Sequence, residues 1–413
     1  MKIKIKKLMW LTLAITLTLL LVVGCGSQAP KETPEKKSGE EAAPPEQKEP
    51  IKLGAIFDIT GATGDVGAPY ADGAKNYIAY LNSQGGINGR KIELIDIDYA
   101  YKIPQAIEAY NKLVKQHKVV AILGWGTGDT EALVEKIRQD KIPYISGSYS
   151  ENLLEIETHP YNFLVAPSYS DQIRFVLQWI KDNWTDTSRN PKVAFIYNDT
   201  GFGRSPIEDG REFAQKIGVD LVDEEIVDLK ALDATSQLLN MKKTEPDFAI
   251  LQETSNATAT VLKDAKKLGL TTQFIGLNWA ADEKVVELAG NAAEGYIGVI
   301  PFAFPYEDLP AIQEIKNWVE SNGGNWAEKN QKFIQGWVSA AVMAEGMKRA
   351  GDDITGEGIQ KGLESIKNFD LGGLASPVSF SAESHRGALK ARLYQVKDGK
   401  FVPLTDWMSL PER

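Results

Sequence analysis

Short apolar runs alternate with helical segments along most of the chain from Ile51 onward. The apolar runs are four to eight residues long and rich in β-branched side chains, as in IKLGAIF, KIELIDID, VVAILG and PYIS. Helices are expected between them, at residues 67–83, 104–116 and 130–139. Strand, helix and strand at this spacing predict right-handed βαβ units and a parallel sheet, so we expect an α/β fold.

The same order of segments begins again in the second half of the chain. KVAFIYN leads through the glycine-bearing loop DTGFGRS into a helix expected at 204–217, and strands and helices then alternate as far as GYIGVI. After Pro301, long helices expected at 309–321 and 329–350 precede the strand-like pieces PVSF, KARLYQV and FVPLT. We infer that the chain returns to its first half there and finishes in its second.

This repeated pattern predicts two similar lobes, each a doubly wound parallel sheet. We expect lobe 1 to contain residues 51–167 and 302–381, and lobe 2 to contain residues 168–301 and 382–413. Several crossings of the chain would then join the lobes. Such a connection predicts a hinge and not a rigid fusion.

The N-terminus has the three parts of an export signal. MKIKIKK carries four lysines, LMWLTLAITLTLLLVV is an apolar run of 16 residues, and small residues surround Cys25 in VVGCGS. Residues 1–24 are therefore expected to be a signal peptide, since the run is short for a membrane span of about 20 residues. Residues 26–50 contain no Val, Ile, Leu, Met or aromatic side chain, which predicts a disordered linker.

Cys25 is the only cysteine in the chain, so no disulfide can form within it. Its setting, LVVGC, resembles the lipobox of bacterial lipoproteins, which would make Cys25 the lipidated first residue of the mature protein. The alternative is an uncleaved anchor with an incidental cysteine. Both interpretations tether the folded part outside the cytoplasmic membrane.

Composition and motifs exclude several function classes. A net charge of −10 argues against a nucleic-acid surface. The three histidines, at positions 117, 159 and 385, lack metal-ligand spacing, and the chain has neither a GxxxxGK[ST] loop nor a GxSxG elbow. The glycines of AILGWGTGDT, residues 121–130, do not follow the GxGxxG spacing of dinucleotide-binding loops. We therefore expect no catalysis, no cofactor and no metal.

Loops rich in glycine and hydroxyl groups follow the expected strands. DITGATGDVG, GWGTGDT and GSYSE lie in the first half, and NDTGFGR, ETSNA and LNWAAD lie in the second. Open α/β sheets bind ligands beyond the carboxyl ends of their strands. Two lobes that face each other with these loops predict a ligand cleft.

Two of these loops suit a carboxylate. Thr127 with Gly128, and Ser148 with Ser150, offer hydroxyls and N–H groups where helices begin, and helix N-termini favour anions. Each hydroxyl alone could simply cap a helix, as Ser and Thr commonly do. The two loops together favour contact with a ligand.

The chain resembles the type I periplasmic-binding family, in particular the Leu/Ile/Val-binding branch that serves ABC importers. The resemblance runs from about Ile51 to Pro301 and continues more weakly to the end. It rests on LNSQGGINGRKIEL, KVVAILG, DTGFGR, PDFAILQ, KKLGLTTQFIG and LAGNAAEGYIG, in this order. It implies two lobes that close on a small ligand, perform no chemistry and present the closed form to a permease.

The resemblance also implies contact residues. In amino-acid-binding members, hydroxyl and backbone groups of the first lobe hold the α-carboxylate, and an acidic side chain of the second lobe pairs with the α-ammonium. The matching positions in this chain are Gly128, Ser148 and Ser150 in the first lobe and Phe202, Thr254 and Asn278 in the second. The two serines can bind oxygen atoms, and Phe202 can wall an apolar side chain.

Two positions depart from the family pattern. Gly128 stands where the family commonly has a serine, although Thr127 beside it can substitute. Asn278 stands where amino-acid binders place the acid, and an amide supplies no charge to a buried ammonium. Either Glu253, which directly precedes Thr254, supplies that charge or the ligand lacks an ammonium.

Three aromatic residues lie in or beside these loops: Trp125, Tyr149 and Trp279. Each could instead pack against a sheet or the hinge. If two of them line the cleft, the pocket would suit an aromatic or bulky apolar acid.

We therefore expect a lipid-anchored, extracytoplasmic solute-binding protein that acts as a monomer with ABC permease and ATPase subunits. Its expected ligand is a branched-chain or hydrophobic amino acid. The main alternative ligand is an aromatic or aliphatic carboxylic acid without an ammonium group. A ligand-sensing subunit of a receptor is the alternative role.

Overall fold

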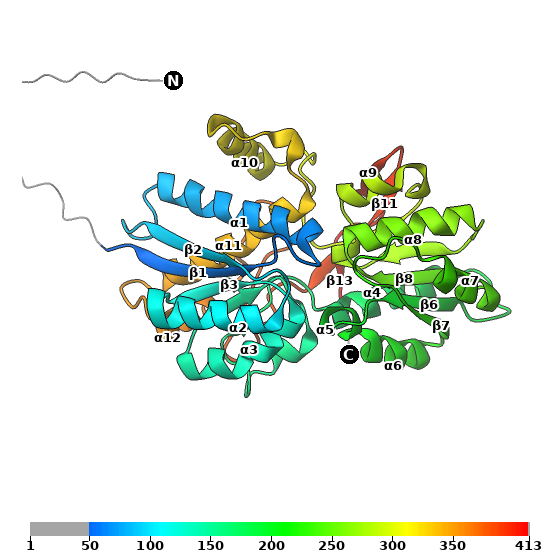
Figure 1. Ribbon diagram of the computed structural model, residues 1–413, viewed down its shortest axis with the longest axis horizontal. Coiled ribbons are helices and arrows are strands. Elements are labelled where there is room, and N and C mark those ends of the chain that lie inside the picture. Colours follow the sequence, from blue (N-terminus) through cyan, green and yellow to red (C-terminus); the bar gives the residue numbers. More distant parts are fainter. Residues whose placement is uncertain (1–48, 412–413) are drawn as a thin grey trace, which may run out of the picture. The chain divides into compact units, whose positions relative to one another are not determined.

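The computed structural model describes residues 49–411 (Figure 1). The expected signal peptide, Cys25 and nearly all of the linker lie outside the described residues. The described part of the chain belongs to one compact unit, Gln47–Arg413. Within residues 49–411, no helix combines the length and the apolar character needed to span a bilayer.

The first sheet is entirely parallel. Its strands are β1 (Ile51–Phe57), β2 (Ile92–Asp98), β3 (Ala121–Gly124), β4 (Tyr144–Ser146) and β5 (Asn162–Phe163). They lie in the order β2-β1-β3-β4-β5, which is a doubly wound order. Strand β1 is buried along almost its whole length, which explains its nearly continuous apolar sequence.

Helical segments connect the strands of this sheet. They are α1 (Gly64–Ser83), α2 (Ile103–Asn111), the π-helical η1 (Lys112–His117), α3 (Thr127–Asp140) and the 3-10 turn η2 (Glu151–Leu154). Every strand thus feeds a loop and then a helix, as the sequence pattern predicts. The loops at the carboxyl ends of the strands therefore gather at one edge of the sheet.

The second sheet repeats the first and then extends it. Its strands are β6 (Lys192–Tyr197), β7 (Asp220–Ile226), β8 (Phe248–Gln252), β9 (Gln273–Gly276), β10 (Ile297–Ile300), β11 (Lys390–Lys397), β12 (Lys400–Pro403) and β13 (Met408–Ser409). From β7 to β10 the order is β7-β6-β8-β9-β10, with every pair parallel. This is the strand order of the first sheet, and it confirms the prediction of two similar doubly wound lobes. Strand β11 adds to β10 in the antiparallel direction.

The helical segments of the second half are α4 (Tyr169–Asn183), α5 (Gly201–Arg204), α6 (Ile207–Ile217), α7 (Thr235–Thr244), α8 (Ser255–Lys267), η3 (Asn278–Ala280), α9 (Glu283–Ala289) and η4 (Gly290–Ala292). The alternation pattern does not predict α4, because it places only a connection there. Its sequence nevertheless carries a capping box: the Ser168 hydroxyl accepts the Asp171 N–H, and the Asp171 carboxylate accepts the Ser168 N–H.

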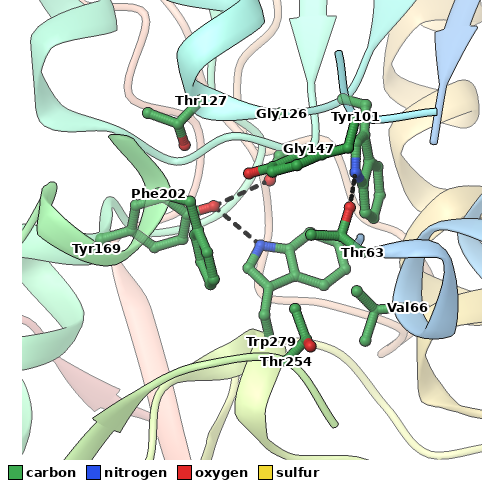
Figure 2. A pocket seen from close by; sticks show the side chains of 11 residues that line it. Thr63, Val66, Tyr101, Gly126, Thr127, Gly147, Tyr169, Phe202, Thr254 and Trp279 are labelled. Carbon is green, nitrogen blue, oxygen red and sulfur yellow. Dashed lines mark hydrogen bonds between the residues drawn. The ribbon is translucent and has the colours of Figure 1, made fainter. Parts of the chain in front are cut away.

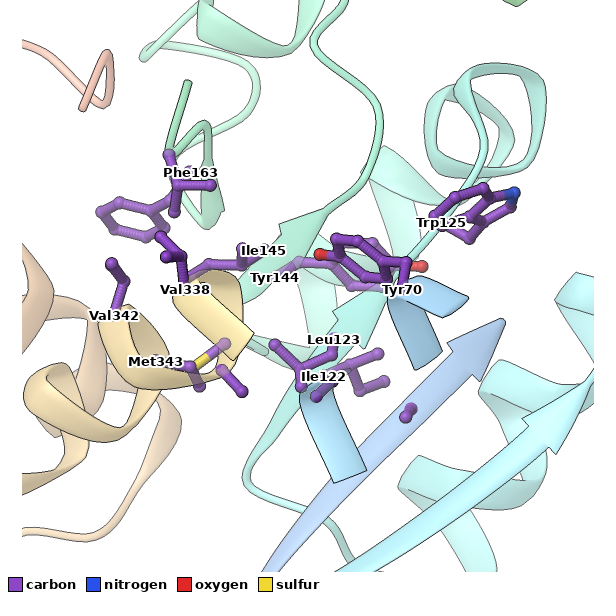
Figure 3. Packing of buried hydrophobic residues seen from close by; sticks show 14 of the residues in the cluster. Tyr70, Ile122, Leu123, Trp125, Tyr144, Ile145, Phe163, Val338, Val342 and Met343 are labelled. Carbon is purple, nitrogen blue, oxygen red and sulfur yellow. The ribbon is translucent and has the colours of Figure 1, made fainter. Parts of the chain in front are cut away.

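The chain then returns to the first sheet. The segments after β10 are α10 (Pro310–Ser321), η5 (Trp326–Glu328), α11 (Gln331–Arg349) and α12 (Gly356–Glu364). Helix α11 packs closely on α1. The absence of a side chain at Gly336 permits this approach, since a Cβ there would lie 1.9 Å from the Tyr70 carbonyl oxygen. In Figure 3, Val338 and Met343 of α11 lie in the same buried cluster as Ile122 of β3.

One predicted strand is wrong. PVSF, residues 377–380, forms no strand, and only Val378 makes an isolated bridge, with Phe369. Val378 and Phe380 are buried in the first core, which explains the apolar sequence without a ladder. The lobe boundaries given above stay a prediction, although the packing of α11 on α1 agrees with a return to lobe 1.

Candidate ligand-binding site

A small cavity lies where loops of the two sheets meet (Figure 2). Its volume is about 20 Å³, which is enough for about one water molecule. The lining residues are Thr63, Val66, Tyr101, Trp125, Gly126, Thr127, Gly147, Tyr169, Phe202, Thr254 and Trp279. Most of them follow the carboxyl ends of strands, so the topology of both sheets places them here.

Aromatic rings from both lobes form most of the wall. Trp125 follows β3 and Trp279 follows β9, and their ring centroids are 4.9 Å apart at an interplanar angle of 66°. The rings of Tyr169 and Phe202 also meet edge to face, with centroids 5.4 Å apart. Tyr101 completes the aromatic lining. The contact between Trp125 and Trp279 crosses from one lobe to the other, whereas Tyr169 and Phe202 both belong to the second lobe.

Hydrogen bonds fix the orientation of the two indoles. Trp125 Nε1 donates to Thr63 Oγ1 over 2.8 Å, and Trp279 Nε1 donates to Tyr169 Oη over 3.0 Å. Figure 2 shows both bonds. Because both indole N–H groups are already paired, the rings offer a ligand mainly their apolar faces and edges.

The predicted carboxylate loops of the first lobe come together only in part. Thr127 lines the cavity, and its Oγ1 lies 2.7 Å from Ser148 Oγ. Ser150 is fully buried at the contact between lobes, where its hydroxyl donates to Glu131 and accepts from Ser205. Gly128 is absent from the cavity lining.

A buried carboxylate supports the loop that carries Thr127. Asp129 accepts the Gly126 N–H over 3.2 Å and the Tyr99 hydroxyl over 2.7 Å. Burial raises the pKa of Asp129 to about 6, and these hydrogen bonds oppose the shift. The hydrogen bonds of Asp129 therefore fix the N-terminus of α3. The first residue of this helix, Thr127, lines the cavity.

The predicted second-lobe residues also separate into two groups. Phe202 and Thr254 line the cavity. Asn278 is fully buried but does not line it, and its backbone N–H donates to Gln172 Oε1 over 3.0 Å. The amide oxygen and nitrogen of Asn278 have no hydrogen-bond partner. Its role in ligand binding stays a prediction.

Glu253 is poorly placed to supply the missing charge. Its side chain is fully buried, and its Oε2 accepts from Asn198 Nδ2 over 3.2 Å. Burial raises the pKa of Glu253 well above the usual range, which opposes an ionised carboxylate here.

Of the three aromatic residues that the sequence singled out, Trp125 and Trp279 line the cavity. Tyr149 instead stacks on Trp279, at 6.1 Å and 10°, from outside the cavity. Sequence reasoning missed Thr63, Val66, Tyr101 and Tyr169. Thr63 and Val66 belong to the loop DITGATGDVG, which the sequence places at the cleft, and a capping box precedes Tyr169.

Similarity to known proteins decides the family. A family model described as periplasmic binding protein matches residues 50–400. The chain belongs to the periplasmic binding protein family. It is therefore a substrate-binding protein, and the family places it outside the cytoplasm.

Several relatives of this periplasmic binding protein are branched-chain amino-acid binders. The Leu/Ile/Val-binding protein homolog 7 of Brucella suis is 21% identical over 370 residues, which cover 85% of this chain and 90% of the relative. The structure of a branched chain amino acid ABC transporter from Thermus thermophilus with bound valine has a TM-score of 0.83. It is 28% identical and covers 88% of this chain and 97% of its own.

The fold by itself does not select the ligand. The fatty acid ABC transporter substrate-binding protein from Thermomonospora curvata has a TM-score of 0.78 at 22% identity, covering 87% of this chain and 92% of its own. At that identity the likeness shows the fold alone. The ligand of this periplasmic binding protein must therefore be argued from its own side chains.

A buried lysine also joins the two lobes of this periplasmic binding protein. Lys332 of α11 donates to the carbonyl oxygens of Asn278 and Ala281, the latter over 3.0 Å, and its Nζ lies 5.3 Å from the Trp279 ring centroid. Burial lowers the pKa of Lys332 to about 8, and nearby carboxylates oppose the shift.

Among residues 49–411, no group of three or more His, Cys, Asp or Glu side chains could hold a metal ion.

Proposed function

We propose that this periplasmic binding protein captures a small hydrophobic carboxylate, foremost a hydrophobic amino acid, and delivers it to an ABC permease. The observation that carries the proposal is the aromatic cavity lined by both lobes, with Trp125 from one lobe facing Trp279 from the other. A ligand between these rings would touch both lobes and so favour the closed form.

The first turn of α3 is the proposed carboxylate site. Thr127 begins this helix and lines the cavity, and its hydroxyl lies beside that of Ser148. The helix N-terminus supplies N–H donors and a favourable dipole for an anion. The aromatic walls would then take the apolar part of the ligand.

Hinge motion is part of the proposal. A cavity of about 20 Å³ is far smaller than the several hundred Å³ typical of ligand pockets, so a ligand enters only when the lobes separate or side chains move. Lobe 1, residues 51–167 with 302–381, would move against lobe 2, residues 168–301 with 382–413. Bonds across the lobes, such as Ser205 Oγ to Ser150 Oγ at 3.1 Å, would break and reform.

Lipidation of Cys25 is also proposed, with residues 26–50 as the tether to the membrane. This arrangement would keep the folded part near the permease on the extracytoplasmic face. Mass spectrometry of the membrane-extracted protein tests it, because a mature N-terminus at unmodified Cys25, or an intact signal peptide, would contradict lipidation.

A second ligand class is supported by one observation. Asn278, at the position where amino-acid binders place an acid, carries no charge and does not line the cavity. A carboxylic acid without an ammonium would need no acidic partner there. The ligand panel below therefore contains acids of both kinds.

The test is a thermal-shift and calorimetric screen of the full chain, purified in detergent. The panel contains leucine, isoleucine, valine and phenylalanine, each beside its des-amino acid. A ligand at 100 times its Kd should stabilise the protein by about 2.7 kcal/mol. Failure of every member to bind would refute the proposed function.

Thr127→Val tests the carboxylate site within the same screen. Loss of the hydroxyl should weaken binding of both ligand classes about tenfold, the usual effect of one hydrogen bond to a charged group. The matched control is Thr187→Val, because Thr187 is exposed. Equal affinities for the Thr127→Val variant and the control would remove Thr127 from the site.

A further inference from the structure

The first turn of α8 gathers carboxylates from both lobes beside the cavity. The Asn256 N–H donates to Asp65 Oδ2 over 2.9 Å, and Asp65 belongs to α1 of the first lobe. The Ser255 hydroxyl donates to Asp282 Oδ1 over 2.8 Å, and Asp282 precedes α9 of the second lobe. Thr254 directly precedes Ser255 in sequence and lines the cavity.

Three buried oxygens in this group have no hydrogen-bond partner: Asp65 Oδ1, Asp282 Oδ2 and Thr254 Oγ1. Thr254 and Asp282 have at most 1% of their surfaces exposed. An unpaired buried polar atom is costly, so three of them around one helix turn indicate a missing donor. A ligand ammonium has three N–H donors and no acceptor, which matches this set.

We propose that Asp65 and Asp282, one from each lobe, form with Thr254 a subsite for an ammonium group of the ligand. This inference rests on the proposed function and deepens it, because it assigns the ammonium to residues other than Asn278. The backbone N–H of Asn256 and the hydroxyl of Ser255 each hold one oxygen of a carboxylate near the positive end of the α8 dipole. The free oxygen of each carboxylate then remains for the cation.

The carboxylates around this subsite carry more negative charge than the buried lysine beside them can balance. Lys332 is the buried cation nearby, and Asp282, Glu283 and Asp65 all favour its charged form. Burial raises the pKa of Glu283 to about 8, so that group is largely neutral near pH 7. Two carboxylates, Asp65 and Asp282, then face one lysine, and one negative charge is left for a ligand cation.

The two proposed polar subsites lie on opposite sides of Trp279. Figure 2 shows Thr127, at the carboxylate site, and Thr254, at the ammonium subsite, on either side of its indole. The distance between the ammonium and carboxylate groups of the ligand is therefore a variable worth testing. The panel must include ligands with both groups on one carbon and ligands with the groups further apart.

The experiment measures Kd by calorimetry for matched pairs on the full chain. Leucine is paired with 4-methylpentanoate, and 5-aminopentanoate is paired with pentanoate. In the wild type, the ammonium-bearing member of at least one pair should bind about 10- to 100-fold more tightly, the range for a hydrogen bond to a charged group. Asp65→Asn should reduce this preference about tenfold or more and leave the des-amino acid unaffected.

Asp65→Asn isolates the charge, because asparagine keeps a carbonyl that can accept the Asn256 N–H. Asp282→Asn is the second variant, since asparagine can also cap α9 and accept from Ser255. The matched control is Asp72→Asn on the same helix, where Asp72 pairs with Lys329 over 2.6 Å. The control should leave the preference unchanged.

Each outcome decides the matter. If Asp65 only latches the lobes together, Asp65→Asn changes both members of a pair equally, and the subsite is refuted. No preference for ammonium-bearing ligands in the wild type refutes the subsite alone, because the des-amino acids still bind. If no member of any pair binds, the proposed function fails and the subsite fails with it.

Discussion

Asp65 should make the unliganded protein less stable as pH rises. Burial raises its pKa from 3.8 to about 6, although the hydrogen bond from the Asn256 N–H opposes the shift. Between these two values the native state binds more protons than the unfolded state, so stability falls with increasing pH. The whole penalty is present above pH 6 and absent below pH 3.8.

The penalty follows from the size of the shift. At 1.36 kcal/mol per pKa unit, a rise from 3.8 to about 6 costs about 3 kcal/mol at pH 7.5 and about 1 kcal/mol at pH 4.5. These are upper bounds, since Asp65 keeps some solvent exposure and water screens its charge. Asp65→Asn removes the titrating group, so its stability relative to the wild type should increase by up to about 2 kcal/mol between pH 4.5 and 7.5.

The assay is guanidinium unfolding of both unliganded proteins at several pH values in that interval. Only the difference between variant and wild type is interpreted, because other buried acids titrate in both proteins alike. A difference that stays constant with pH would refute the reasoning, and so would one that moves in favour of the wild type. Saturation with an ammonium-bearing ligand should abolish the pH dependence, because the bound cation stabilises the ionised form of Asp65.

Three further substitutions test the packing around the site, each by guanidinium unfolding. Trp279→Ala should cost about 3–5 kcal/mol and abolish measurable ligand binding, and retention of wild-type affinity would show that this ring does not wall the cavity. Gly336→Ala should cost about 1–3 kcal/mol, because its Cβ would lie 1.9 Å from the Tyr70 carbonyl; an unchanged midpoint would contradict that contact. Arg386→Met should cost about 1.5–3 kcal/mol, because Glu151 and Asp171 lose one of their two arginine partners and keep Arg174. The control is Arg138→Met, whose exposed ion pair with Glu135 is screened by water, so it should cost clearly less; equal losses would show that the Arg386 pairs contribute no more than a surface pair.

The repeated α/β architecture could be predicted from the sequence because its signals are local. Apolar runs such as IKLGAIF and QFIG coincide with β1 and β9, since buried parallel strands read as continuous apolar segments. Helix α4 was missed although Ser168 and Asp171 mark its start, because only the strand–helix alternation was followed there. The sequence predicts a strand at PVSF because a buried apolar segment outside a sheet has the same composition as a short strand.

The sequence by itself determined that the loops which line the cavity lie at the carboxyl ends of the strands. This follows from parallel topology, and it is why Trp125, Thr127, Phe202 and Thr254 line the cavity. Only the tertiary structure decided which side chains of those loops enter the cavity.

Asn278 and Trp279 are neighbours in sequence, yet the indole lines the cavity and the amide does not. Asp65 and Lys332 gain their partners only because α1 and α11 pack against the second lobe. Contacts between residues far apart in the chain depend on how whole elements pack, and no local periodicity records that packing.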